Sequence, residues 1–327
     1  MRKKGKILVI GLVFVIVASF FLFVACNKTA PIEKSARDFV SMDKRPDAPA
    51  IVVDGSTPEE KIYNLYMIAL NNLKTTPYLA AHNEGLFENT TAGMTNYLYD
   101  DYIILKTPDR YFYCNYRSIK DCPIADSAIF ASIFKEMGAI LSERRYYEKG
   151  EEQAYFQMNN DNIMNEQNLP TTEWDSLEMQ EMDPIVFNAD DAGSFVINEH
   201  DFQLDFIIDD DEFPITFEEK EDEDGNKYYS MTFALDPDQA TTISEKKIKE
   251  QTGDENTKYN RLTYAITIWD NGYFRTYDND SYFAGKALGV FSAKYKDEYY
   301  WHFSYDQQDC NIDAYVDAAG IRDVYKS

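Results

Sequence analysis

The chain has 327 residues, with 57 Asp and Glu against 32 Lys and Arg, which gives a formal net charge of −25. This acidic balance excludes binding to nucleic acid or to an anionic membrane surface through a basic stripe, because such binding needs clustered Lys and Arg. Aromatic residues make up 15% of the chain, which excludes disorder of the whole chain and allows a sizeable core.

The first 25 residues have the layout of a secretory signal. Four basic residues lie within the first six positions, and residues 7–24 form an apolar run of 18 residues. A run of this length is also compatible with an uncleaved membrane-spanning anchor, which is the alternative. The flank favours cleavage, because Phe23, Val24 and Ala25 lead directly into Cys26.

The segment ending in Ala25 and Cys26 resembles the lipobox of bacterial lipoproteins, in which the cysteine is acylated after cleavage. Phe23 departs from the aliphatic residue that this motif prefers. The resemblance implies cleavage between Ala25 and Cys26, lipid on the Cys26 sulfur, and an extracytoplasmic protein anchored to the cell membrane. Removal of residues 1–25 would leave 28 basic residues against 57 acidic ones, a net charge of −29.

Residues 26–50 are rich in charge, Pro and small residues and show no sustained period, so we expect a lipidated tether. The patterns that follow predict a single extracytoplasmic domain over residues 51–327. Residues 159–224 begin with a stretch of weak pattern and are a possible insertion in that domain.

The first element of the domain is an amphipathic helix that begins at Pro58. Thr57 and Glu60 have the spacing of a capping box, and Pro58 stands at the first helical position. Helical spacing then predicts one buried face, made of Ile62, Leu65, Tyr66, Ala69 and Leu73. A second helix is expected over residues 129–141. A third is expected from Pro237, with Asp236 as its cap and Gly253 as its end.

Most of the remaining sequence alternates between apolar and polar residues, which predicts half-buried antiparallel strands. Such strands are expected at residues 79–87, 97–105, 111–116, 202–208, 229–235 and 262–268. Turns are expected at residues 107–109, 224–225, 271–272 and 296–298. The absence of a repeating strand–helix–strand pattern argues against a parallel nucleotide-binding sheet.

The order of these elements resembles that of LolA and LppX type lipoproteins. The resemblance is carried by TPEEKIYNLYMIALNNLK, RYYEKGEEQAYF, MTFALDPDQATT and LTYAITIWDNGYFRTY, within residues 57–156 and 228–283. It implies an α+β fold: a curved antiparallel β-sheet, or half-barrel, with amphipathic helices packed on one face. Some members bind lipid chains under these helices, so Ile62, Leu65, Tyr66, Ala69 and Leu73 are candidate lining residues of a ligand cavity. The chain is longer than the family pattern between Asn159 and Asp224.

Motifs for catalysis or for metal binding are not found in the sequence. The histidines His82, His200 and His302 lie in no metal-ligand spacing, and no nucleophile elbow surrounds a serine. The acidic runs at residues 209–212 and 218–224 lack the ligand spacing of a calcium loop and are expected to be solvated hairpin tips. Cys114 and Cys122 could form a disulfide or remain buried thiols. We expect no catalytic residue, no metal and no cofactor.

The sequence therefore predicts a lipid-anchored, noncatalytic cell-envelope protein that binds an apolar ligand, such as a lipid or acyl chain, or a partner protein. The expected partners are the membrane, through lipid on Cys26, and that ligand or envelope protein, and not nucleic acid. The alternative is a cell-envelope hydrolase or an accessory subunit of an enzyme.

Overall fold

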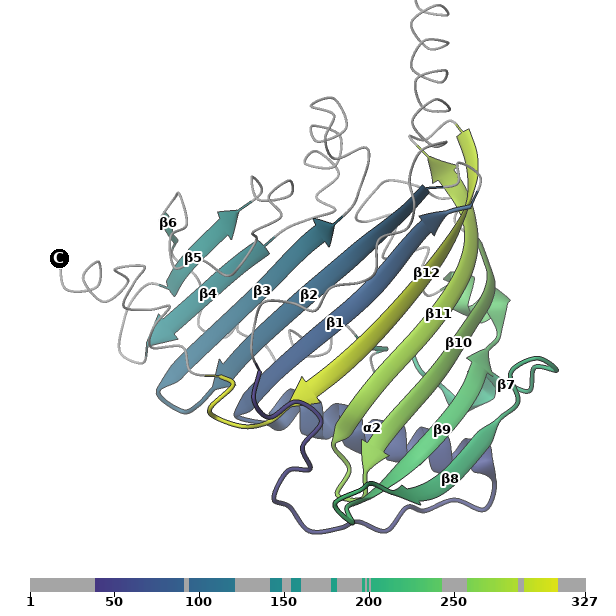
Figure 1. Ribbon diagram of the computed structural model, residues 1–327, viewed down its shortest axis with the longest axis horizontal. Coiled ribbons are helices and arrows are strands. Elements are labelled where there is room, and N and C mark those ends of the chain that lie inside the picture. The colour runs from purple at the N-terminus through teal and green to yellow at the C-terminus, as the bar shows by residue number, and fades with distance from the viewer. Residues whose placement is uncertain are drawn as a thin grey trace, which may run out of the picture.

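The computed structural model describes residues 39–90, 94–120, 142–148, 154–159, 178–180, 196–197, 199, 201–242, 258–287 and 291–310. Within these residues the chain forms one long helix and a 12-stranded antiparallel sheet (Figure 1). The elements are α2 Pro58–Thr75, β1 Tyr78–Asn89, β2 Met94–Lys106, β3 Arg110–Lys120, β4 Ser142–Glu148, β5 Ala154–Asn159, β6 Glu178–Gln180, the 3₁₀ helix η4 Leu204–Phe206, β7 Ile207–Ile208, β8 Thr216–Glu221, β9 Lys227–Leu235, β10 Lys258–Trp269, β11 Phe274–Ala287 and β12 Phe291–Ser304.

The sheet joins the two ends of the sequence at its centre. Its strand order is β6-β5-β4-β3-β2-β1-β12-β11-β10-β9-β7, and β8 pairs with β9 beside β7. The first and last long strands, β1 and β12, are therefore neighbours, with Ala81 opposite Phe303 and His82 opposite His302. β6 and β7 are the ends of this order, so the sheet is not closed.

Helix α2 begins where the capping box predicts. The Thr57 hydroxyl accepts a hydrogen bond from the Glu60 N–H at 3.3 Å, and the Glu60 carboxylate accepts one from the Thr57 N–H at 3.4 Å. These two bonds satisfy amide groups that a helix start leaves free. The prediction for the start of this helix is confirmed.

Several of the predicted strands and turns are confirmed. Residues 229–235 lie in β9, residues 262–268 in β10, and the three early segments lie in β1, β2 and β3. Gly225 and Gly272 have φ angles of 82° and 80° at the tips of the β8–β9 and β10–β11 hairpins. Glycine favours these turns because it adopts positive φ without steric strain.

Two strand-level predictions are wrong. Residues 202–208 form a 3₁₀ turn followed by only two residues of strand, because β7 meets β9 at only two positions. Residues 296–298 do not turn, since β12 continues through them and Lys296 is opposite both Glu88 and Tyr282. Pairing on both sides holds this charged segment extended, although its sequence is typical of a hairpin tip.

The predicted α+β fold, with amphipathic helices packed on one face of the sheet, is wrong. The described residues are mainly antiparallel strand and include only two α-helical segments. One is α2, and the other begins at Pro237, where the Asp236 carboxylate accepts hydrogen bonds from the N–H groups of Asp238 and Gln239. The second predicted helix, residues 129–141, lies outside the described residues. Strand pairing, rather than a layer of helices, dominates the described fold.

The largest core cluster lies between α2 and the face of the sheet that it covers, which we name the α2 face. In Figure 1 α2 runs behind the lower ends of the central strands. Tyr66 is the centre of this core: its ring lies 4.4 Å from that of Phe202 and 5.5 Å from that of Phe274, centroid to centroid. The Tyr66 hydroxyl donates a hydrogen bond to the Ile197 carbonyl at 2.7 Å, so its buried polar end is satisfied.

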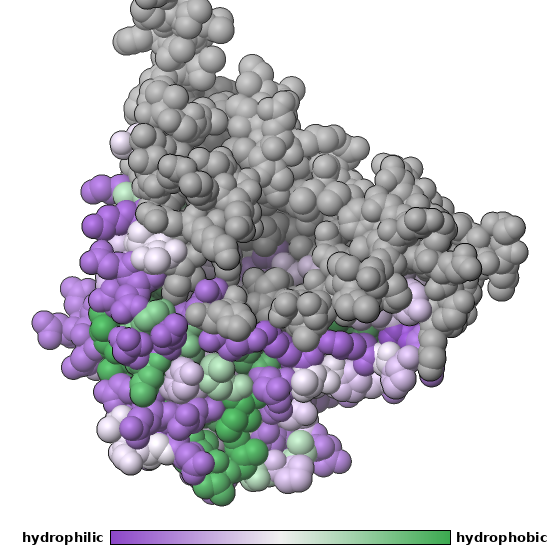
Figure 2. Space-filling model, turned by 180° about the vertical axis from the view of Figure 1, so that it is seen from behind, coloured by the Kyte–Doolittle hydropathy of each residue, from purple (hydrophilic) through white to green (hydrophobic). Residues whose placement is uncertain are grey.

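The described part of the molecular surface is mostly hydrophilic when seen from behind, and hydrophobic residues gather at the lower end of that view (Figure 2). Among the described residues the most exposed large hydrophobic side chain is Val52, at 85%. None of the helices in the described ranges combines the length and apolar character needed to span a bilayer.

Candidate functional site

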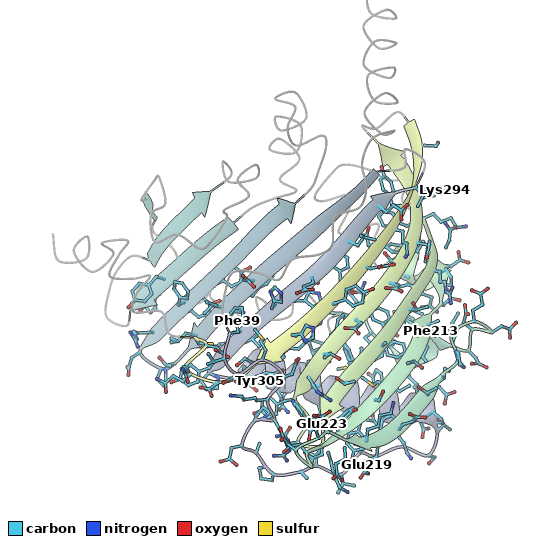
Figure 3. The ribbon with its side chains drawn as sticks, viewed as in Figure 1. Phe39, Phe213, Glu219, Glu223, Lys294 and Tyr305 are labelled. Carbon is cyan, nitrogen blue, oxygen red and sulfur yellow. The ribbon has the colours of Figure 1, made fainter. Side chains whose placement is uncertain are left out.

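The sheet face opposite α2 carries a second set of buried and half-buried groups. We name it the strap face, because residues 39–45, the strap, pack on it. Phe39 and Met42 of the strap contact a small core that contains Ala80, Ile103, Leu105, Phe112, Tyr146 and Cys310. Figure 3 shows Phe39 in front of the sheet, on the side opposite α2. Side chains two positions apart on a strand point to the same face, so His82 lies on the same face as Ala80. Directly opposed residues of antiparallel strands also share a face, so His302, which is opposite His82, lies there too.

Polar groups gather on this face in two adjacent rows across β2, β1, β12 and β11. In the first row Asp101, His82, His302 and Thr276 are neighbours. In the second row Glu84, Tyr300 and Asp278 are neighbours. We name the group formed by Asp43, His82, Glu84, Asp101, Asp278, Asp280, Glu298, Tyr300 and His302 the strap-face cluster.

His82 is held between two carboxylates. Its Nδ1 lies 2.7 Å from Asp101 Oδ1 and its Nε2 lies 3.5 Å from Glu84 Oε1. Burial alone lowers the pKa of His82, but the hydrogen bond and negative charge of Asp101, aided by Glu84, outweigh it and raise the pKa. The side chains of His82 and Asp101 are 12% and 4% exposed, so this pair is largely shielded from solvent.

His302 binds the strap. Its Nδ1 lies 2.8 Å from Asp43 Oδ2, and the Asp43 N–H donates a hydrogen bond to the Phe303 carbonyl at 3.0 Å. The hydrogen bond that His302 makes to the Asp43 carboxylate raises the pKa of His302, while burial opposes it. The negative charges of Asp278 and Glu84 raise it further. His302 is therefore a proton-binding group at the junction of strap and sheet.

Carboxylates on β11 and β12 continue the cluster. Burial raises the pKa of Asp278 to about 6 against the nearby positive charge of His302, and burial also raises the pKa of Asp280. Glu298 accepts a hydrogen bond from the Tyr300 hydroxyl at 3.1 Å and forms an ion pair with Lys296. The cluster as defined holds six carboxyl groups and two histidines, so its field attracts cations and raises the pKa values of both histidines.

A single carboxylate clamps the strap. Asp309 accepts hydrogen bonds from the Val40 N–H at 2.8 Å and from the Ser41 N–H at 2.9 Å, one on each oxygen. Asp309 and Ser41 are 9% and 3% exposed. Hydrogen bonds to a charged acceptor are stronger than neutral ones, so this two-point contact fixes the backbone of the strap.

The sequence-predicted site residues have different positions. Ala25 and Cys26 lie outside the described residues, as do His200 and Cys122. The five candidate cavity-lining residues, Ile62, Leu65, Tyr66, Ala69 and Leu73, are 0–1% exposed and belong to the core under α2. That they line a cavity stays a prediction.

The acidic runs are partly neutralised by local ion pairs. Arg261 lies 2.9 Å from Glu212 and 3.5 Å from Asp210, and Lys227 lies 2.8 Å from Glu219. Within the described ranges, no group of three or more His, Cys, Asp and Glu side chains is arranged to hold a metal ion.

The cluster around His82 and His302 is missing from the sequence-based candidates, although both histidines are considered there as possible metal ligands. They are 220 positions apart, so no motif spacing joins them. They become neighbours only through the pairing of β1 with β12. Alternation shows which residues of one strand share a face, but not which strands are adjacent.

Comparison with known proteins adds no assignment to this geometry, which therefore has to support any functional proposal by itself. The sequence matches no protein-family model and no curated protein.

Proposed function

We propose that this protein is a lipid-anchored component of the cell envelope that binds a partner protein without catalysis, through the strap face. The observation that carries this proposal is the strap-face cluster, in which carboxylates from four adjacent strands and the strap, together with Tyr300, surround two histidines. Such a surface suits a basic segment of a partner, because Lys and Arg are attracted by the carboxylates and stack on aromatic rings.

The position of the strap supports a membrane-proximal role for this face. Only twelve residues separate Cys26 from Phe39. Even a fully extended chain of that length spans no more than roughly 45 Å. Lipid on Cys26 would therefore hold the strap face within reach of other proteins at the membrane surface.

A partner protein is a better candidate for the bound molecule than an apolar ligand under α2. The apolar side of α2 packs against aromatic side chains of the sheet, with Leu65 and Tyr66 each 0% exposed. This close packing favours a filled core over a cavity for an acyl chain at these positions. Native mass spectrometry of the purified protein tests the apolar-ligand alternative, which copurifying lipid would support.

The lipid anchor is tested with Cys26→Ser. We expect the wild-type protein to incorporate labelled palmitate and to fractionate with membranes, and the variant to lose the label, because only Cys26 directly follows the apolar run. The variant should be released or remain as an uncleaved precursor. Equal labelling of both proteins would refute the anchor.

The binding face is tested with a defined probe, an oligolysine peptide, added to the mature protein. We expect Glu84→Gln with Asp278→Asn to weaken binding, because both carboxylates face Tyr300 in one row of the cluster. The control is Glu223→Gln with Asp224→Asn at the exposed β8–β9 hairpin tip, which changes the net charge equally. Binding should be salt-sensitive and sensitive only to the first pair. If both double substitutions weaken binding equally, the peptide responds to the net charge of the protein and does not bind specifically at the strap face.

One observation favours the hydrolase alternative. A carboxyl group with a pKa of about 6, such as that of Asp278, can act as a general acid near neutral pH. Glycoside and ester substrates tested with the wild type, Asp278→Asn and His302→Gln distinguish the two. Turnover that both substitutions abolish would establish an enzyme and overturn the noncatalytic proposal.

A further inference from the structure

The strap is attached at two points of different chemistry. At the first point the Asp309 carboxylate receives the N–H groups of Val40 and Ser41. At the second point the His302 ring is hydrogen-bonded to the Asp43 carboxylate. Next to it, the Asp43 N–H donates a hydrogen bond to the Phe303 carbonyl. The first contact needs only an ionised carboxylate, whereas the second is charge-assisted only when the imidazole carries a proton.

We propose that the strap is a releasable cover on the strap face, whose attachment at Asp43 weakens when His302 loses its proton. The strap covers the His82 end of the cluster as well, since the Phe39 ring lies 6.4 Å from the His82 ring, centroid to centroid. Opening would uncover the row that contains His82 and His302.

The carboxyl groups that face His302 favour its protonated form. They are Asp43 of the strap, Glu84 of β1 and Asp278 of β11, and His82 of β1 is the other titratable neighbour. A protonated His82 would oppose a second positive charge, but Asp101 and Glu84 are hydrogen-bonded to it and offset that charge.

The direction of the pH effect follows from the raised pKa of His302. A histidine whose pKa is higher in the docked state stabilises docking fully below its undocked pKa, and this contribution is lost as pH rises through the docked pKa. Asp278, whose pKa is raised to about 6, loses its negative charge below that pH and then favours protonated His302 less. The strap should therefore dock more tightly in mildly acidic solution than in mildly basic solution.

Amide hydrogen exchange of the full chain in detergent tests the proposal directly. Peptides covering residues 39–45 are followed at about pH 5.5 and about pH 8, on either side of the ordinary histidine pKa, with rates corrected for intrinsic exchange. We expect several-fold higher protection at the acidic pH, since a pKa raised by one unit corresponds to about tenfold in the docking equilibrium. Equal protection at the two pH values would overturn the proposal.

Three variants assign the effect. His302→Gln should abolish the pH dependence, because glutamine keeps a hydrogen-bonding group without a titrating charge, whereas His82→Gln should retain it. Asp309→Asn should lower protection of the strap at both pH values. Retention of the wild-type pH dependence in His302→Gln, or its loss only in His82→Gln, would refute the role of His302. Peptides from β10 report global unfolding. If a variant loses protection in these peptides, it is unfolded, and the comparison of the wild type at the two pH values decides the proposal. No ligand enters this experiment, so its failure is distinguishable from failure of the proposed binding function.

Discussion

The α2 face buries apolar side chains, whereas the strap face partly buries carboxyl groups. On the α2 face, Leu65 is fully buried among apolar neighbours, whereas on the strap face the carboxyl group of Asp278 is half-buried and its pKa is raised by burial. Removal of an apolar group from the first leaves a cavity, while removal of the charge from the second relieves desolvation. Substitutions at the two sites should therefore change stability in opposite directions.

Leu65→Ala should destabilise the protein by about 2–5 kcal/mol, because a buried leucine loses both its transfer free energy and its packing contacts. Urea unfolding followed by circular dichroism measures the change. Val52→Ala is the matched control, since Val52 is 85% exposed and should change the free energy of unfolding by less than about 0.5 kcal/mol. A loss at Leu65 no larger than at Val52 would contradict the filled core under α2.

Asp278→Asn should stabilise the protein at neutral pH. The folded-state pKa of Asp278 is raised to about 6, so its ionisation favours the unfolded state as pH rises from the unfolded value toward 6 and above. After allowance for partial solvent screening, we expect a gain of about 1–2 kcal/mol at neutral pH and little change below about pH 4. The exposed Asp224→Asn serves as control, and thermal unfolding across pH decides the outcome. A neutral or destabilising Asp278→Asn at pH 7 would contradict the desolvation argument.

At the scale of elements, the β10–β11 hairpin is joined to α2 through a glycine. Asn72 of α2 donates its side-chain N–H to the Gly272 carbonyl at 2.8 Å. A Cβ at Gly272 would meet Ile68 Cγ2 at 2.8 Å, in addition to adopting a φ of 80°. Gly225 has nearly the same φ, 82°, but its Cβ would meet only Glu221 Oε1, at 3.6 Å.

These two glycines make a matched pair. Gly225→Ala should cost about 1–2 kcal/mol from backbone strain alone. Gly272→Ala should cost clearly more, since α2 must also shift away from the hairpin. Chemical denaturation of both variants measures the difference. Equal losses would mean that the contact between hairpin and helix is readily adjusted.

At the scale of the whole molecule, the raised pKa values act in one direction. His82, His302 and Asp278 all have raised pKa values, and burial raises the pKa of Asp297 to about 8. Asp297 Oδ1 is buried and has no hydrogen-bond partner among the described residues. Each of these groups binds a proton more tightly in the folded state than in the unfolded state, so each favours folding more at lower pH.

We therefore expect the melting temperature to rise as pH falls from about 8 to about 5.5, an interval that includes the pKa values of Asp278 and Asp297. Self-repulsion within a chain of net charge −25 works in the same direction, and salt screens it. Repeating the measurement in high salt separates the two causes, because buried groups keep their pKa shifts. A melting temperature that falls over the same interval would contradict the assignments.

Short-range features of the sequence predicted individual elements well. The capping box at Thr57 and Glu60 defined the start of α2, and glycines at positions 225 and 272 defined two hairpins. These signals are reliable because one or two neighbouring residues satisfy all of their hydrogen-bonding or steric needs. Where pairing with another strand overrides the local pattern, as at residues 202–208 and 296–298, the same reasoning failed.

The sequence by itself determined the acidic charge and the alternation that becomes the strands of the sheet. The secretory signal and the lipid attachment at Cys26 stay predictions from the sequence. Only the tertiary structure decided that β1 lies beside β12 and that the strap returns to Asp309 and His302. The reason is physical: a strand can pair with any strand of compatible pattern, and the choice is made by the packing of the whole sheet. The strap-face cluster is a product of that choice.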